Sequence, residues 1–524
     1  MGIYLNPGKE MFQESILSKI YVDKTGLIAE MNDILGTEEK FVCVSRPRRF
    51  GKSMAAKMLV AYYSRECDSR ELFSELNISK NPSFEKYLNQ FDVLFFNMQR
   101  FLSRAGDAKE MLPYLQMAVL KELRLTYGED IDETETKLVT ALEHIYNRTK
   151  KGFVFIIDEW DSIFREKQTD IEVQTAYLDF LRDLLKDQPY VKLAYMTGIL
   201  PIKKYGTHSA LNMFDEFSMT DQKWLAEYTG FTEKEVQKLC DEYGMDFSET
   251  KRWYDGYRFR RAPHVYNPKS VVTAMRGAEF SSYWTQTETY EALKVYIEMN
   301  FDGLKDDIIL MLNGGRCRIN TGTFSNDMVT FQTKDDVLTL LIHLGYLAYD
   351  IDAKEVYVPN EEVRGEFVNA ITASGWQEVI SAFQASEQLL KATLAGNTEA
   401  VAKGLDLVHT EAASVLTYNN ENSLSCAVSL AYYSARAYYT LVRELPAGKG
   451  FADIVFVPRR ACTEYPAMIV ELKWDKSAEG AIAQIKEKQY ADALKDYSGE
   501  ILLVGINYNR KTKTHQCVIE HCTK

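Results

Sequence analysis

The chain has 524 residues, of which 46% are hydrophobic and 26% are charged, as in an ordinary globular protein with several domains. No apolar run approaches the roughly 20 residues that span a bilayer, and the N-terminus lacks a secretory signal, so we expect a cytoplasmic protein without membrane contact. The net charge of −13 argues against indiscriminate coating of nucleic acid, so any DNA contact requires a local basic surface.

The first predicted elements surround a short phosphate-binding motif. Residues 41–44 are an apolar, β-branched run typical of a buried strand, and Ala55–Leu59 favours helix. Gly51, Lys52 and Ser53 lie between them. A strand, a loop ending in Gly-Lys-Ser and a helix make up a P-loop, in which backbone amides and Lys hold phosphates and the hydroxyl holds Mg²⁺. We therefore predict nucleotide binding at Gly51, Lys52 and Ser53.

This loop departs from the Walker A pattern at one position, because Arg46 stands where the pattern has its first glycine. A non-Gly residue with positive φ there would cost roughly 1–2 kcal/mol, so we expect the loop to follow a different path. We expect Arg46, Arg48 and Arg49 to compensate by contacting phosphate, and we assign Arg48 and Arg49 to nucleotide binding. The alternative is a basic surface turn after an ordinary strand.

A second apolar run, starting at Gly152, ends abruptly in Asp158 and Glu159. This is the Walker B arrangement, in which the Asp belongs to the Mg²⁺ shell and the Glu polarises the attacking water. Buried strands also end in acidic turns without any such role. The order and separation of the two motifs together favour nucleotide binding.

Two further strands are predicted at 92–97 and 191–198, and they alternate with helical segments. This alternation predicts an α/β sheet with ligands at the carboxyl ends of its strands. Thr197 lies where P-loop ATPases of this type place a polar sensor of the γ-phosphate. An ordinary Thr-Gly turn at the end of a strand is an equal alternative.

The middle of the chain, from about residue 220, becomes helical and acidic. Residues 335–344 predict a helix, and short strands follow at 347–351 and 355–358, which is the layout of a winged helix. Winged helices mediate protein contacts as often as they bind DNA, and no basic recognition face is visible here. We therefore expect a packing role, with residues 360–420 as a helical linking region.

The C-terminal region predicts a second α/β unit, with strands at 439–445, 451–457 and 467–474, a helix at 480–494 and a last strand at 501–506. Glu471 and Lys473 are two residues apart, so they project from one face of their strand, whereas Val470 and Leu472 point into the core. Asp453 lies on the neighbouring strand of the hairpin, where it is expected opposite them.

Asp453, Glu471 and Lys473 are the minimum set for metal-assisted phosphodiester hydrolysis. Two carboxylates hold Mg²⁺, which keeps several waters, and the Lys orients or deprotonates one of those waters. The alternative is an exposed strand face with a cross-strand salt bridge worth only about 0–1 kcal/mol. The strong β-forming residues around each charge and Gln484 on the following helix favour the catalytic site.

With its predicted nucleotide-binding and nuclease residues taken together, the chain resembles a bacterial family that joins an AAA-like ATPase domain to a C-terminal PD-(D/E)xK nuclease domain. The likeness runs nearly end to end. It rests on Tyr21–Thr25, Arg46–Ser53, Ile156–Glu159, Thr197–Gly198, Trp253–Tyr257, Gly450–Asp453 and Glu471–Lys473. The family itself lacks the first Walker glycine.

The resemblance implies an α/β fold in three parts. These are a P-loop NTPase α/β/α core at 1–220, a helical and winged-helix-like region at 221–375 and a restriction-endonuclease-like α/β domain at 376–524. It implies ATP and Mg²⁺ as cofactors, with Mn²⁺ as an alternative metal at the nuclease site.

The family's functional residues carry over onto both motifs. Lys52 and Ser53 would hold phosphate and Mg²⁺, and the Walker B pair and the nuclease triad are those already described. Gln484 matches a glutamine on the helix after the triad. Nucleases with this glutamine often have Tyr four residues later, where this chain has Lys488, and the nearest tyrosine is Tyr490.

We therefore expect an ATP-binding and ATP-hydrolysing protein coupled to a Mg²⁺-dependent DNA nuclease, with defence or mobile-element biology as a hypothesis. Its expected partners are ATP, DNA through a local surface, and a second copy of the chain or another protein. The alternative is a nucleotide-dependent scaffold or switch whose nuclease-like domain binds nucleic acid or protein without cutting. The intact triad favours the nuclease, because a degenerate nuclease usually loses one of the three residues.

Overall fold

The computed structural model describes residues 2–522, except 129–130, 203–210, 285–289, 300, 302, 413–420, 448–449, 460–461, 495–496 and 498. The chain divides into two compact units. The first unit contains Met1–Thr289 and Arg318–Gly365, and the second contains Tyr290–Cys317 and Glu366–Lys524. The domain boundaries expected at residues 220 and 375 stay a prediction. No helix in the described part of the chain has the length and apolar character needed to cross a membrane.

A five-stranded parallel sheet lies at the centre of the first unit, in the order β2-β3-β4-β1-β5. Its strands are β1 (Phe41–Ser45), β2 (Asp92–Asn97), β3 (Phe153–Asp158), β4 (Val191–Gly198) and β5 (Asp215–Phe217). Every residue of β1 and β3 is buried, as expected for parallel strands that are covered on both faces. Because β4 lies between β1 and β3, the carboxyl ends of these three strands are adjacent. The four strands predicted in this region are confirmed.

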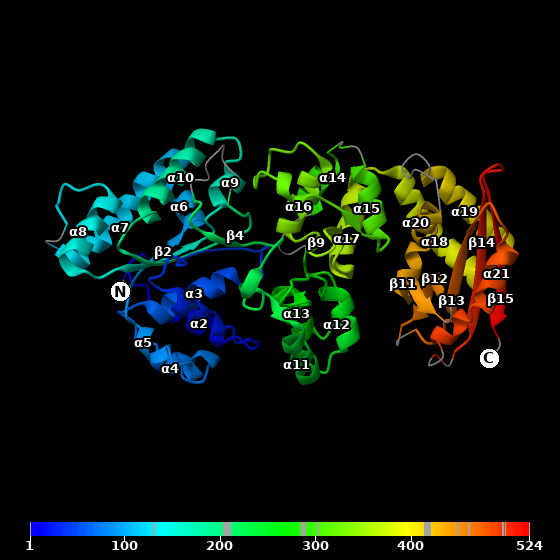
Figure 1. The fold of residues 1–524 in the computed structure, drawn as a ribbon, viewed down its shortest axis with the longest axis horizontal. Helices are drawn as coiled ribbons and strands as arrows, with labels where there is room; N and C mark the ends of the chain where they lie inside the picture. Colours follow the sequence, from blue (N-terminus) through cyan, green and yellow to red (C-terminus); the bar gives the residue numbers. More distant parts are fainter. Residues whose placement is uncertain are drawn as a thin grey trace. The chain divides into compact units, whose positions relative to one another are not determined.

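Helices cover both faces of this sheet. Figure 1 shows α2 (Gly26–Ile34), α3 (Lys52–Tyr63), α4 (Arg70–Phe73) and α5 (Phe84–Tyr87) on one side. The other side carries α6 (Met98–Ala105), α7 (Met111–Tyr127), α8 (Leu138–Thr149), α9 (Ser162–Glu166) and α10 (Ile171–Leu185). A core of apolar side chains from α2, α3 and the strands fixes α3 against the sheet, and this packing places the start of α3 at the carboxyl ends of the strands.

The rest of the first unit is mainly helical. It contains α11 (Glu233–Tyr243), α12 (Phe247–Tyr254), α13 (Pro268–Gly277) and the short antiparallel pair β6 (Phe231–Thr232) and β7 (Val265–Tyr266). Further on, α16 (Lys334–Leu344) precedes β9 (Ala348–Asp350) and β10 (Glu355–Tyr357), in a sheet ordered β8-β10-β9 with β8 (Cys317–Arg318). The expected helix and both short strands are confirmed. Tyr257 donates to the carbonyl of Gly345 at 2.6 Å, so the aromatic stretch before β7 packs against this region.

The second unit contains a five-stranded mixed sheet in the order β11-β12-β13-β14-β15, in which only β13 and β14 run parallel among the described pairs. The strands are β11 (Tyr439–Ala447), β12 (Gly450–Pro458), β13 (Ala467–Trp474), β14 (Ile501–Asn509) and β15 (Thr514–Cys522). Its helices are α14 (Tyr290–Ile297), α15 (Leu304–Leu312), α18 (Gln377–Leu394), α19 (Thr398–Ala412), α20 (Glu421–Ala431) and α21 (Ala478–Glu487). It also contains α17 (Glu361–Ala373) from Glu366 onward. The helical prediction for 360–420 holds except that residues 413–420 lie outside the described residues.

Two predictions for this unit are corrected. The strand at 501–506 is not the last, because β15 follows it; β15 is a polar edge strand without the apolar run that marks a buried strand. The helix expected at 480–494 is broken into α21 and a short 3-10 helix, Tyr490–Leu494, because Gln489 takes a left-handed conformation with φ of 57°. The mixed α/β fold class itself is confirmed.

Candidate functional sites

The loop between β1 and α3 turns at two left-handed residues. Gly51 has a φ of 90° and directly precedes the first residue of α3, and Arg49 has a φ of 69°. A Cβ on Gly51 would meet nothing within 4 Å, so glycine suits this position because of its backbone conformation and not for lack of space. Arg46 is not among the residues with positive φ, so the chain does not strain at the position of the absent Walker glycine.

Arg46 itself is fully buried. Its Nε donates to the hydroxyl of Thr229 at 2.8 Å, its Nη2 donates to the carbonyl of Ala226 at 3.2 Å, and its guanidinium lies 4.2 Å from the ring centre of Phe259. The expectation that Arg46 contacts phosphate is therefore wrong, because the side chain is used to anchor the loop. Arg48 and Arg49 are exposed on the same loop.

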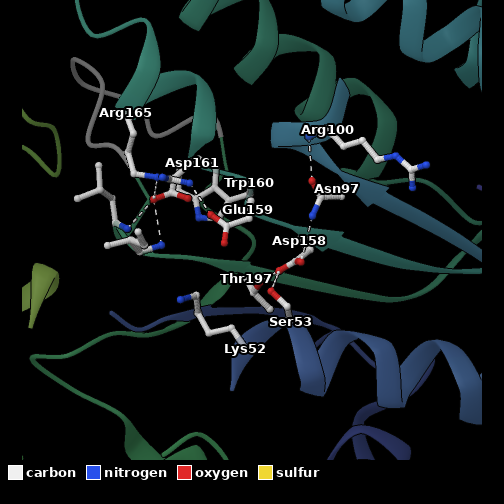
Figure 2. A network of polar contacts seen from close by, with 12 residues as sticks. Lys52, Ser53, Asn97, Arg100, Asp158, Glu159, Trp160, Asp161, Arg165 and Thr197 are labelled. Atoms are coloured by element: carbon white, nitrogen blue, oxygen red, sulfur yellow. Dashed lines mark hydrogen bonds and ion pairs between the residues drawn. The ribbon is translucent and has the colours of Figure 1, made fainter. Parts of the chain in front are cut away.

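Lys52 extends back into the curve of the loop and is only 4% exposed. Its ammonium donates to the carbonyls of Arg46 and Pro47, both at 2.8 Å. Burial lowers the pKa of Lys52, and the negative charges of Glu159, Asp161 and Asp158 oppose that shift. The ammonium is thus held by the loop's carbonyls, and Lys52 lies near the acidic end of β3 (Figure 2).

The carboxylate of Asp158 is the point where three strand ends and α3 meet (Figure 2). Ser53 and Thr197 donate to its Oδ1 at 3.2 and 2.5 Å, and the amide of Asn97 donates to its Oδ2 at 3.3 Å. The predicted residues Ser53, Asp158 and Thr197 are therefore brought together. A carboxylate next to a hydroxyl is a set of hard oxygen ligands that fits Mg²⁺.

Glu159 lies beside this point and belongs to a second polar group. It has a φ of 55°, and its Oε2 pairs with Nη2 of Arg165. Nε of Arg165 in turn donates to Asp161 at 3.2 Å. Burial raises the pKa of Glu159, and the positive charges of Lys52 and Arg165 oppose that shift.

A cavity of about 310 Å³ opens on another side of the same loop. It is bounded by the loop and the first turns of α3, by residues 18–24, and by α13. Its apolar wall includes Tyr21, Val22, Met54, Met58, Tyr228, Phe231 and Val272. Its cations are Lys19, Lys24, Arg49, Lys269 and Arg276, and no Asp or Glu is among the described residues that line it. An apolar wall with cations around it suits a ligand that has a flat apolar part and a negative charge.

The second predicted site lies on β13, the central strand of the mixed sheet. Glu471 is 2% exposed and Lys473 is 8% exposed, and the ammonium of Lys473 donates to Oε1 of Glu471 at 2.9 Å. The alternative of an exposed strand face is therefore wrong. The β12–β13 pairing, with Ile454 opposite Val470, places Asp453 beside Glu471, and Oδ2 of Asp453 accepts the backbone amide of Leu472 at 2.7 Å.

Burial and then the charge of Asp453 raise the pKa of Glu471 to about 7, while Lys473 opposes this shift. Oε2 of Glu471 is buried and accepts no hydrogen bond from the described residues. Two neighbouring carboxylates, one of them with an unmatched buried oxygen, form a set of oxygens that fits a divalent cation.

Comparison with known proteins gives a family match for each of the two regions that contain these residues. Residues 8–208 match the family described as predicted AAA-ATPase, and residues 419–517 match the PD-(D/E)XK nuclease superfamily. The chain joins an AAA-ATPase-like domain to a PD-(D/E)XK nuclease-like domain. The resemblance drawn from the motifs is thus confirmed. A protein of Azotobacter chroococcum mcd 1, described as "Uncharacterized protein in vnfD 5'region", is 23% identical over 516 residues, which cover 94% of each chain.

The AAA-ATPase-like domain contains polar residues that the motifs did not indicate. Asn97 ends β2 beside β3, and its Oδ1 also accepts the backbone amide of Arg100 at 2.9 Å, which fixes the side chain. Asn97 could have been predicted from the sequence, because it is a polar residue at the end of an apolar strand. Asp161 and Arg165 were also missed, although their i, i+4 spacing next to the acidic pair was visible in the sequence.

In the nuclease-like domain, Gln484 contacts both the predicted site and a tyrosine. Its Nε2 donates to Oε1 of Glu471 and, at 3.2 Å, to the hydroxyl of Tyr490. Tyr490 can make this contact because α21 ends at Glu487 and the left-handed Gln489 turns the chain back.

Proposed function

We propose that this protein binds and hydrolyses ATP at the Asp158 site and uses the Glu471 site to cleave phosphodiester bonds in DNA with Mg²⁺ or Mn²⁺. The observation that carries the proposal is the convergence of the Ser53 and Thr197 hydroxyls on Asp158 at the start of α3. Helix N-termini bind phosphate through their unpaired amides and positive dipole end.

The proposed nucleotide position follows from the groups around the loop. The amides at the start of α3 and the ammonium of Lys52 face the phosphates, and Ser53 and Asp158 hold Mg²⁺. The cavity beside the loop takes the base against its apolar wall, and Arg49 in its lining supplies further charge. Arg48, exposed on the same loop, supplies charge as well. Glu159 accepts the proton of the attacking water, and Thr197 contacts the γ-phosphate.

The proposed nuclease site uses the buried carboxylate of Glu471 together with Asp453. A divalent cation bound there would lower the pKa of a water and offset the charge of the scissile phosphate. Lys473 holds Glu471 in place and orients the attacking water. Gln484, fixed between Glu471 and Tyr490, limits the positions open to the carboxylate.

The nucleotide half is tested by isothermal titration of ATP with Mg²⁺ into wild-type protein and Lys52→Ala. We expect Lys52→Ala to abolish detectable binding, whereas Lys57→Ala on the same helix, which is partly exposed, is the matched control and retains it. Glu159→Gln should bind ATP normally but hydrolyse it slowly. Equal ATP affinity for Lys52→Ala and wild type would overturn the P-loop assignment.

The nuclease half is tested by Mn²⁺ binding, measured by electron paramagnetic resonance without nucleotide. Asp453→Asn should lose a Mn²⁺ ion that wild type and the exposed control Glu479→Gln both bind. If Asp453→Asn and wild type bind Mn²⁺ equally, the scaffold alternative replaces the nuclease. The net charge of −13 favours that alternative, in which a protein partner is bound instead of DNA. The link to defence or mobile elements stays a prediction.

A further inference from the structure

We propose that Arg165 is a positioning residue for ATP hydrolysis, which holds the carboxylate of Glu159 in the orientation needed to activate water. This inference rests on the proposed ATPase function. It starts from Figure 2, in which Glu159, Asp161 and Arg165 form a group beside the Ser53, Asp158 and Thr197 group.

The backbone of Glu159 is held in a conformation that L-residues rarely adopt. Its φ is 55°, although it directly follows a regular strand. Two hydrogen bonds maintain this turn: the amide of Trp160 donates to the carbonyl of Thr197 at 2.9 Å, and the amide of Ser162 donates to the carbonyl of Glu159 at 3.0 Å. Strained backbone held by its surroundings is typical of functional sites, and here it turns Glu159 toward Arg165.

Arg165 engages two carboxylates through different nitrogens. Nη2 pairs with Oε2 of Glu159, while Nε donates to Oδ2 of Asp161 at 3.2 Å. The side chain of Arg165 is 7% exposed, so this is not a solvent-screened surface pair. The planar fork of arginine supports both contacts at once, whereas the single ammonium of lysine does not have this geometry.

Asp161 anchors the group to the end of the neighbouring strand. Its Oδ2 also accepts the backbone amides of Ile199 and Leu200, at 2.9 and 2.8 Å. These residues directly follow Gly198, the last residue of β4, which itself follows Thr197. A Cβ on Gly198 would come within 2.6 Å of the Trp160 ring and 2.9 Å of Asp161, so only glycine lets the two segments approach so closely. Arg165 therefore links Glu159 to the strand that carries the proposed γ-phosphate contact.

This arrangement gives Arg165 a role that acts only through Glu159. Arg165 engages Oε2 of Glu159, and 19% of the Glu159 side chain remains exposed. Loss of Arg165 would free the carboxylate to rotate, and misplacement of a general base by about 1 Å lowers a rate by up to about a hundredfold. The phosphate-binding groups around Lys52 would keep their places.

The experiment is a double-mutant cycle on steady-state ATP hydrolysis, with ATP affinity measured by titration on each variant. We expect Arg165→Ala to lower kcat at least about tenfold while ATP affinity stays within about threefold. In the Glu159→Gln background, Arg165→Ala should cause no further loss. Arg165→Lys should remain impaired, and Arg182→Ala, which removes a half-exposed arginine with its own ion pairs on α10, should match wild type.

The outcomes distinguish failure of the Arg165 role from failure of the proposed ATPase function. Wild-type kcat in a folded Arg165→Ala protein, or a further loss in the double variant, overturns the role of Arg165 and leaves Glu159 as the base. Wild-type hydrolysis by Glu159→Gln overturns both. If Arg165→Ala does not fold, Asp161→Asn, which preserves volume and acts through Arg165, makes the same test: lowered kcat at unchanged affinity supports the role, and unchanged kcat overturns it.

Discussion

Arg46→Gly would restore the Walker A pattern, and the structure predicts that it harms the protein instead. Glycine at position 46 removes the donors to Thr229 and Ala226 and the cation stacked on Phe259. It also loosens the segment whose carbonyl accepts the ammonium of Lys52. Glycine relieves no backbone strain that could offset these losses, because Arg46 does not have positive φ.

The size of the effect follows from the groups left behind. Each buried acceptor without a donor costs about 1–3 kcal/mol, and the lost cation–π contact about 0.5–2 kcal/mol. Relief from burying a guanidinium, together with water entering the space, offsets part of this sum. We therefore expect the free energy of unfolding of the first unit to fall by about 2–4 kcal/mol, with weaker ATP binding.

Two measurements are combined. Tryptophan fluorescence monitors unfolding in urea, and isothermal titration measures ATP binding. The matched control for the unfolding measurement is Arg48→Gly, an exposed change on the same loop, which should alter the free energy of unfolding by no more than about 1 kcal/mol. If Arg46→Gly unfolds like wild type and binds ATP more tightly, the buried anchoring role of Arg46 is refuted and the Walker glycine would be the better residue.

Three further outcomes are expected. Arg48→Ala or Arg49→Ala should weaken ATP affinity about ten- to a hundredfold, since a charge-assisted phosphate contact is worth roughly 1.5–3 kcal/mol, while Arg510→Ala should not; titration of ATP compares the three. Asp453→Ala should abolish DNA cleavage but leave ATP hydrolysis intact, as measured by parallel assays on one preparation, and loss of both activities would contradict separate sites. Burial lowers the pKa of His409 from 6.5 to about 4, so the unfolded chain takes up the proton first and the second unit should lose stability as pH falls from about 6.5 towards 4. Denaturation at several pH values should find this dependence weaker in His409→Gln, with the remainder due to His515, whose pKa burial also lowers.

Sequence alone determined the strands that carry both sites. β1, β3 and β13 are buried on both faces, and such strands require continuous apolar runs that are visible without any structure. Charged residues stand out against those runs, which is why Asp158 at the end of β3 and Glu471 within β13 could be identified. β15 was missed for the same reason, because a polar edge strand has no such run.

Only the tertiary structure decided which neighbours these residues have. Arg46 and Thr229 are 183 positions apart, and the local sequence gave Arg46 the appearance of a phosphate ligand. Asn97 reaches Asp158 only because β2 and β3 are adjacent in the sheet, and Tyr490 reaches Gln484 only because the chain turns at a left-handed residue. Local patterns record burial and propensity, whereas contacts between distant segments depend on sheet order and backbone turns, which no single stretch of sequence contains.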